Sequence, residues 1–360
     1  MPIEQVDVGV YEFPTPYPEA DGTFEWSKTT AVTVQVHAGG EHGLGWTYSS
    51  PAAAAVITQH LAEELRERDA HDIPGAWQAM RRAGRNLGAR GLYGQALSAA
   101  DIALWDLKAR LLGLPLTDLF GRCWDSVPVY GSGGFITQTE QQYAEQVEGW
   151  RAAGCTAMKI KIGEAWGSNI DRDLARMRRL RELAGDGVEL MADANGAYSI
   201  GQARRVGEAL DELKVVWFEE PVSSDDVAGL GTLRAALRCD VTAGEYAADG
   251  YEMARLLPVV DCLQLDVTRC GGYSGFLQGA ALAAAANRQI SGHCAPALHA
   301  PIAGALANLR HVEWFADHAA LEPLLVDGVP VVRDGRMSAD TERPGHGMRL
   351  AATAQAYRQD

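Results

Sequence analysis

The sequence predicts an α/β protein whose larger part is a (β/α)8-type barrel. From residue 127 onward, short apolar runs alternate with segments of helical periodicity, the order that builds a parallel sheet covered by helices. Asp193, Glu219 and Glu245 each end such a run and lie 26 residues apart, about the length of one strand and its return helix. With 360 residues, the chain can form one such barrel and a smaller domain.

The N-terminal part is expected to begin with two strands. Residues 2–10 and 30–37 alternate apolar and polar side chains, as half-buried strands do. The segments 14–26 and 43–48 are rich in proline or glycine, and we interpret both as loops. Both carry aromatic residues, so they either cover a substrate or are surface turns with packed rings.

Helical periodicity follows in the segments 51–65, 75–82 and 96–112. In the last of these, small and apolar residues share one face, and Gly113 with Pro115 ends the helix. Residues 122–126 then form a hinge into the barrel.

Eight segments have the short apolar character of barrel strands: 127–130, 157–162, 189–192, 215–219, 241–245, 262–266, 289–293 and 311–315. Amphipathic helices fill the intervals, for example at 138–153, 169–183, 201–213 and 275–288. After them, 330–335 is predicted to form a strand and turn. The sequence therefore predicts an N-terminal domain at 1–122, a barrel at 123–324, and a C-terminal segment at 325–360 that returns to the first domain.

Composition excludes several classes of protein. A formal net charge of −15 argues against a nucleic-acid partner, and an anionic substrate would need local positive charge. No segment approaches the roughly 20 apolar residues of a membrane span, and the N-terminus lacks the pattern of a signal peptide. The six cysteines are scattered without a paired motif, which is typical of buried reduced thiols. We expect a cytoplasmic protein.

The three evenly spaced carboxylates predict a metal site. Asp193, Glu219 and Glu245 should meet at the C-terminal ends of successive parallel strands, where chemistry in such barrels is found. Converging carboxylates repel one another unless a cation neutralises them, and oxygen ligands favour Mg²⁺. The alternative is that each forms a salt bridge with a neighbouring Lys or Arg. Glu220 adjoins Glu219, but strand alternation should turn it away from the barrel interior.

Lys159 and Lys161 lie two residues apart on one strand and should both point into the barrel mouth. A second ammonium and a divalent cation nearby would disfavour the charged form and lower the pKa of a lysine, which could then act as a general base. The alternative is a pair of solvated lysines.

Asp266 ends the sixth predicted strand and His293 ends the seventh, so the two residues lie on adjacent strands of the barrel. A carboxylate beside an imidazole fixes its tautomer and stabilises its protonated form, which makes an acid–base group. Glu313, on strand eight, is a candidate to contact the substrate; the alternative is a capping or salt-bridged glutamate.

These motifs resemble the enolase superfamily, within it the mandelate racemase-like subgroup. The resemblance covers nearly the whole chain and rests on Met-Lys-Ile-Lys-Ile-Gly (158–163), Met-Ala-Asp-Ala-Asn-Gly (191–196), Trp-Phe-Glu-Glu-Pro (217–221), Ala-Gly-Glu (243–245) and Ala-Leu-Trp-Asp-Leu-Lys (103–108). It implies a modified TIM barrel of (β/α)7β type with an N-terminal α+β capping domain. Mg²⁺ is the implied cofactor, with Mn²⁺ as a substitute, and the first Glu of Glu-Glu-Pro is the ligand.

The resemblance also implies roles for the other residues. Lys161 would abstract a proton, Lys159 would contact the substrate carboxylate and lower the pKa of its neighbour, and Glu313 would contact the enolate or the carboxylate. Muconate-cycloisomerase-like relatives and dipeptide epimerases have a lysine where this chain has Asp266, which makes a cycloisomerase a poorer fit. Tyr17, Trp26, Tyr48 and Asn195 are candidates for substrate binding, the first three within segments 14–28 and 43–50.

The chemistry that these groups suit is abstraction of the proton alpha to a carboxylate, giving an enediolate that a metal stabilises. Lys161 and His293 come from opposite sides of the barrel and would flank the α-carbon. Loss of a β-hydroxyl would make the protein an acid-sugar dehydratase, which is the outcome we predict. Return of the proton to the other face would make it a racemase or epimerase. A non-catalytic metal-binding scaffold is the third possibility. The partner is a small carboxylate, and a homo-oligomer is expected.

Overall fold

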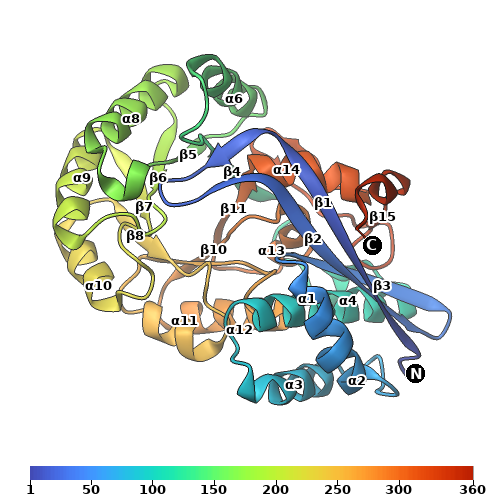
Figure 1. Cartoon of the computed structure of the whole chain (residues 1–360). Coiled ribbons are helices and arrows are strands. Elements are labelled where there is room, and N and C mark those ends of the chain that lie inside the picture. Colours follow the sequence, from blue (N-terminus) through green and yellow to red (C-terminus); the bar gives the residue numbers. More distant parts are fainter. Residues whose placement is uncertain (360) are drawn as a thin grey trace.

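Eight parallel strands form a closed barrel in the computed structural model, which describes residues 1–359 (Figure 1). Each strand pairs with the next, and the last pairs with the first through Val312 and Val129, which closes the barrel. The strands are β4 (Val127–Gly133), β5 (Ala157–Lys161), β6 (Glu189–Asp193), β7 (Val215–Glu219), β8 (Asp240–Ala243), β9 (Cys262–Leu265), β10 (Gln289–Gly292) and β11 (Leu309–Phe315). The predicted α/β barrel is confirmed.

Helices cover the outside of the barrel (Figure 1). They are α6 (Glu140–Ala152), α7 (Glu164–Gly167), α8 (Ile170–Ala184), α9 (Ile200–Glu212), α10 (Val227–Ala236), α11 (Gly250–Leu256), α12 (Gly272–Ala285), α13 (Pro296–Ala303) and α14 (Ala316–Leu325). Two of them start where the sequence provides a capping box: Thr139 with Gln142 for α6, and Ser199 with Gln202 for α9. Each box satisfies backbone N–H groups that the first helical turn leaves unpaired.

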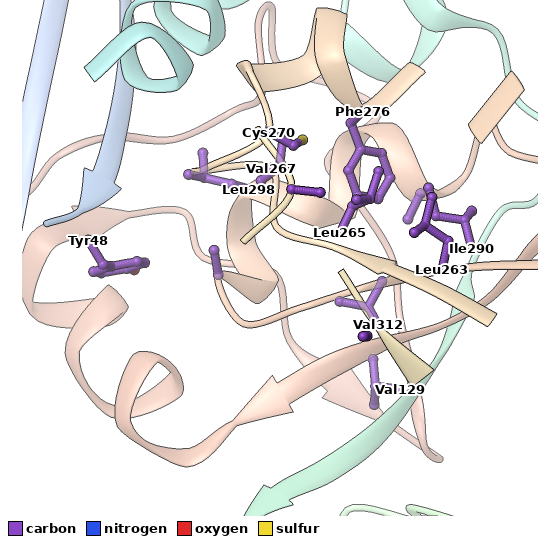
Figure 2. Close-up of a cluster of buried hydrophobic side chains, with 14 of the residues drawn as sticks. Tyr48, Val129, Leu263, Leu265, Val267, Cys270, Phe276, Ile290, Leu298 and Val312 are labelled. Carbon is purple, nitrogen blue, oxygen red and sulfur yellow. The ribbon is translucent and has the colours of Figure 1, made fainter. Parts of the chain in front are cut away.

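Alternation along the strands decides which side chains enter the barrel. On β9, Leu263 and Leu265 lie in the apolar layer with Phe276 of α12 and Ile290 of β10 (Figure 2). Gln264, between them, instead donates a hydrogen bond to the Tyr130 hydroxyl at 2.8 Å. Because successive side chains of a strand point to opposite faces, the polar residues at the strand ends are aimed into the barrel mouth.

The N-terminal domain is an antiparallel sheet with helices, as expected for an α+β capping domain. The sheet has the order β1 (Gln5–Ala20), β2 (Glu25–Ala38), β3 (Glu41–Tyr48). Its helices are α1 (Ala52–Val56), α2 (Ala62–Leu65), α3 (Ile73–Ala83), α4 (Leu92–Leu111) and α5 (Leu116–Phe120), with a π-helical turn at Ile57–Leu61 joining the first two. Figure 1 shows the hairpin of β1 and β2 extending over the barrel.

Both segments interpreted as loops are in fact strands. Residues 14–26 form the end of β1, a short turn, and the start of β2. The prolines are tolerated because β1 is an edge strand and Pro14, Pro16 and Pro18 are all exposed, so their missing N–H groups interrupt the pairing without burying an unpaired carbonyl. The register shifts between Pro14 and Glu19.

The glycines of the second segment have a packing role in β3. A side chain at Gly43 would lie 2.1 Å from the carbonyl oxygen of Ala103, and one at Gly45 would lie 2.2 Å from that of Ala99. The strand can approach α4 this closely only because both positions lack a Cβ atom. The sequence pattern suggested a flexible loop where the fold requires close contact between a helix and a strand.

The C-terminal segment contacts both parts of the protein. The predicted strand and turn form a hairpin of β13 (Val332–Arg333) and β14 (Arg336–Met337), and β14 pairs with barrel strand β4. Beyond it, β15 (Arg349–Leu350) pairs with β12 (Val326–Asp327), and the Tyr357 ring lies 4.6 Å from Phe13 of β1. The domain bounds 1–122, 123–324 and 325–360 stay our proposal. Among the described residues, no helix is long and apolar enough to cross a membrane.

Asp106 of α4 links three parts of the chain. It is fully buried, and its carboxylate accepts hydrogen bonds from the backbone N–H groups of Leu44 and His346, each at 2.8 Å, and from Arg110 at 2.8 Å. Removing such a carboxylate leaves buried donors and a guanidinium without partners.

We therefore expect Asp106→Ala to lower the free energy of unfolding by about 3 kcal/mol or more, measured by chemical denaturation. The matched control is Asp186→Ala, at an exposed turn position, which should change this free energy by less than about 0.5 kcal/mol. Equal effects of the two substitutions would contradict a structural role for the Asp106 network.

Candidate active site

The barrel mouth gathers the lysines and carboxylates predicted from the sequence. Lys159 Nζ lies 2.6 Å from Glu219 Oε2, 2.8 Å from Glu313 Oε1 and 3.7 Å from Asp193 Oδ2. Lys161 Nζ lies 2.5 Å from Asp193 Oδ2. All five side chains are buried, so these charges meet in a region with little water to screen them.

The expected lowering of the lysine pKa values is not seen in this arrangement. Burial opposes the charged form of Lys161, but the adjacent Asp193 carboxylate outweighs it and raises the pKa of the ammonium. For Lys159, Glu219 and Glu313 likewise outweigh burial and raise the pKa. The prediction considered only the positive charges near each lysine. In the structure, carboxylates contact both ammonium groups directly.

His293 is held between carboxylates on both sides of its ring. Its Nδ1 lies 3.0 Å from Asp266 Oδ2, while its Nε2 lies 3.2 Å from Glu245 Oε2. Burial opposes protonation, yet the Cys294 sulfur, 3.3 Å from Nε2, and Glu245 favour it and raise the pKa of His293 well above its usual value. These neighbours therefore favour the protonated form of the imidazole.

Asp266 stays ionised beside this imidazole. Burial would raise its pKa, but the Arg269 guanidinium, with Nε at 3.2 Å, and His293 together lower that pKa to about 2. Arg269 also contacts Glu245, from Nη1 to Oε1 at 3.0 Å. Arg269 thus has two carboxylate partners in the site.

The carboxylates have free oxygen atoms that suit a cation. Glu219 Oε1 is buried without a hydrogen-bond partner among residues 1–359, and Glu245 Oε2 faces His293 Nε2 at 3.2 Å outside hydrogen-bond geometry. Ligand atoms of Glu219, Glu245 and His293 lie within 4.8 Å of one another, and Asp193 lies beside Glu219 through their shared contact with Lys159. Buried carboxylate oxygens without donors are expensive unless a cation approaches them, so the donor set fits Mg²⁺ or Mn²⁺.

Glu220 follows the end of β7 and is buried. Burial, followed by the charges of Glu245 and Asp193, raises its pKa well above the usual value, so it lies near the same carboxylates. Strand β7 ends at Glu219, and a φ of 36° at Glu220 breaks the alternation that should have turned it away. No pattern in the sequence indicated this turn.

Lys161, Glu245, Arg269 and His293 line a cavity of about 370 Å³, together with residues of the capping domain. Among the candidates for substrate binding, Trp26, Tyr48 and Asn195 line it. Tyr17 does not; its hydroxyl accepts a hydrogen bond from Gln138 at 2.8 Å, and its ring packs against the cluster that contains Phe135. The sequence missed several lining residues, among them Thr29, Cys294, Asp317 and His318.

Comparison with known proteins agrees with this geometry. Residues 7–121 match the family model for the mandelate racemase/muconate lactonizing enzyme N-terminal domain, and residues 142–354 match that for the enolase C-terminal domain-like region. The chain therefore belongs to the mandelate racemase/muconate lactonizing enzyme family of the enolase superfamily.

Individual relatives extend over nearly the whole chain. A mandelate racemase/muconate lactonizing enzyme-like protein from Rubrobacter xylanophilus has a TM-score of 0.96 and 42% identity, with 100% of each chain covered. L-talarate/galactarate dehydratase of Salmonella typhimurium is 34% identical over 89% of this chain and 80% of the relative. Its structure with Mg and L-lyxarohydroxamate has a TM-score of 0.91, 31% identity, and coverage of 100% of this chain and 93% of that one. A 3,6-anhydro-alpha-L-galactonate cycloisomerase of Streptomyces coelicolor is 31% identical over 97% of each chain.

Proposed function

We propose that this protein is a Mg²⁺-dependent dehydratase of a sugar acid. The observation that carries the proposal is that Lys161 and His293 line one cavity beside a cluster of buried carboxylates, which favour the protonated form of the imidazole. Lys161 comes from β5 and His293 from β10, with β4 and β11 between them on the shorter way round the barrel. A substrate lying between the two side chains would meet a base and an acid together.

The reaction follows from what each residue can do. Lys161 can act as the base only in its neutral form, which requires a cation to offset the charge of Asp193 that raises its pKa. In that form it would remove the proton from the carbon next to the carboxylate, while the ammonium of Lys159 would contact that carboxylate. The electron pair of the broken C–H bond forms a C=C bond, the β-hydroxyl leaves, and His293 donates the proton that makes it water. The enol product then tautomerises to a 2-keto acid. Glu313, which contacts Lys159, positions this ammonium.

Asp193, Glu219 and Glu245 would hold Mg²⁺, and Mn²⁺ could replace it. When bound, the cation supplies the positive charge that stabilises the anionic form of the substrate during proton removal. Proton abstraction at such a weakly acidic carbon needs this stabilisation in addition to a base.

The experiment is a screen of aldonic and aldaric acids with added Mg²⁺, read out by release of a 2-keto acid and by α-proton exchange in D₂O. Release of a 2-keto acid is the expected result. Absence of both release and exchange with every hydroxy acid would contradict the proposal and favour a non-catalytic scaffold.

A racemase or epimerase is the second candidate, because Lys161 and His293 line one cavity from different strands and could act as two bases. Exchange of the α-proton with inversion, but without a 2-keto acid, would identify it. A cycloisomerase would instead convert the substrate into a product of the same mass. Asp266, where muconate-cycloisomerase-like relatives have a lysine, argues against a cycloisomerase of that type. A cytoplasmic location and a homo-oligomeric state remain part of the proposal, and light scattering measures the latter.

Asp266→Asn should lower kcat by about a hundredfold and change its dependence on pH. Removing the carboxylate beside Nδ1 lowers the pKa of His293, so its acidic form is lost at a lower pH. The alkaline limb of the kcat profile should therefore move down by about one to two units. An unchanged pH profile in a folded variant would contradict the role of His293 as the acid.

A further inference from the structure

The outer half of the catalytic cavity is lined by the capping domain and by the start of α14. Trp26 and Thr29 come from β2, Tyr48 ends β3, and Asp317 and His318 lie in the first turn of α14. Thr29 Oγ1 donates a hydrogen bond to Asp317 Oδ2 at 2.6 Å, which joins the two domains across the cavity. The Tyr48 and His318 rings are stacked, with centroids 3.6 Å apart.

This wall is negative at neutral pH. Asp317 is only 7% exposed, and burial raises its pKa to about 6, so it is mainly ionised at pH 7. Glu19 lies behind it and accepts a hydrogen bond from the Trp26 indole at 3.1 Å. Burial and the charge of Asp317 raise the pKa of Glu19 to about 8, so of this pair Glu19 keeps its proton and Asp317 carries the charge.

Apart from Lys161 and His293 at the reacting end, the basic residues that line the cavity are paired or neutral. Arg269 is paired with Glu245 and Asp266, on the side of the carboxylate cluster. His318 is neutral, because burial lowers its pKa to about 3. Lys28 is 59% exposed and lies 2.5 Å from Glu12, so its charge is screened by water and by a carboxylate.

We propose that this outer wall selects a substrate whose far end is uncharged and hydroxylated, with Asp317 as the residue that determines this specificity. The inference rests on the proposed function and narrows it. The substrate is then a monocarboxylic sugar acid of the aldonic class, and a dicarboxylic acid of the aldaric class is rejected.

The physical reason is that one end of the cavity accepts an anion and the other repels it. A hydroxyl group can donate a charge-assisted hydrogen bond to the second oxygen of Asp317, with Thr29 and Thr30 as further polar neighbours. A carboxylate in the same place would face a like charge in a partly desolvated site, which costs several kcal/mol unless a cation compensates.

The test compares, with the wild-type protein and Mg²⁺, each aldonic acid with the aldaric acid of the same configuration. We expect kcat/KM to favour the best aldonic acid over its aldaric counterpart by at least about a hundredfold. A preference for aldaric acids would overturn the inference and leave the dehydratase proposal intact. Loss of α-proton exchange with both classes would contradict the dehydratase proposal itself, and the inference would fall with it.

Two variants locate the selectivity. Asp317→Asn keeps the shape of the side chain and removes the charge, so it should reduce the preference for aldonic acids about tenfold or more. The matched control Asp186→Asn, at an exposed position outside the cavity, should leave the ratio unchanged. Lys28→Met tests the opposite explanation, in which Lys28 binds a second carboxylate.

If Asp317→Asn leaves the ratio of kcat/KM between aldonic and aldaric acids unchanged, Asp317 does not determine this specificity. A specific loss of aldaric acid turnover in Lys28→Met would overturn the exclusion of dicarboxylic acids. If Asp317→Asn does not fold, the wild-type ratio and the Lys28→Met result still decide the inference.

Discussion

Lys161→Ala should abolish turnover, with kcat lower by on the order of 10³–10⁴-fold, while the protein stays folded. The residue is placed by β5 so that its ammonium contacts Asp193 and lines the cavity opposite the imidazole of His293. Alanine cannot remove the α-proton. Lys159 is paired with Glu219 and Glu313, and Lys28, which also lines the cavity, is paired with Glu12. The measurement is α-proton exchange in D₂O together with release of a 2-keto acid.

Two controls separate loss of the base from loss of structure. Mg²⁺ binding, followed by calorimetry, should persist in Lys161→Ala because all three carboxylates remain. Lys214→Ala, at an exposed position after α9, should keep the wild-type rate. Exchange at the wild-type rate in Lys161→Ala would remove Lys161 from the mechanism.

Removal of the divalent cation should also reduce the rate by at least about a thousandfold, because the charge stabilisation it supplies is worth several kcal/mol. Protein dialysed against EDTA should lose exchange and regain it with Mg²⁺. Glu219→Gln should weaken Mg²⁺ binding by about a hundredfold or more, since it replaces a charged ligand in a buried site.

Glu189→Gln is the matched control for this substitution. Glu189 is exposed at the start of β6, at the other end of the strand from Asp193, so its replacement should leave Mg²⁺ affinity unchanged. Full activity in the presence of EDTA would contradict the metal-dependent mechanism, whatever the effect of the two substitutions.

The barrel could be predicted because its strands are short, apolar and regularly spaced. Alternation along β5 and β9 then placed Lys159, Lys161 and Asp266 at one rim, which needs no information beyond the strand period. Family resemblance added the roles of these residues, which spacing alone did not provide. The placement of these side chains at one rim was therefore predictable from the sequence, and their roles stay part of the proposal.

The outer half of the cavity was not predictable in the same way. Asp317 and His318 lie on a helix after the last barrel strand, and Thr29 lies on a distant strand, so only the folded chain brings them together. Strand β3 was interpreted as a loop because glycines in a sequence usually indicate a flexible segment. Gly43 and Gly45 instead allow β3 to approach α4 closely, since a side chain at either position would clash with the helix. Positive φ at Glu220 likewise had no local signal.

The hydrogen bond between Thr29 and Asp317 joins β2 of the capping domain to α14 of the barrel. In the proposed reaction, the wall formed by β2 and α14 would meet the far end of the substrate, while Lys161 and His293 would meet its reacting carbon. Substitutions in this wall are therefore expected to change substrate preference without removing the catalytic residues. Exchanging residues of the β1–β2 hairpin between homologues is accordingly expected to change the substrate preference of this fold.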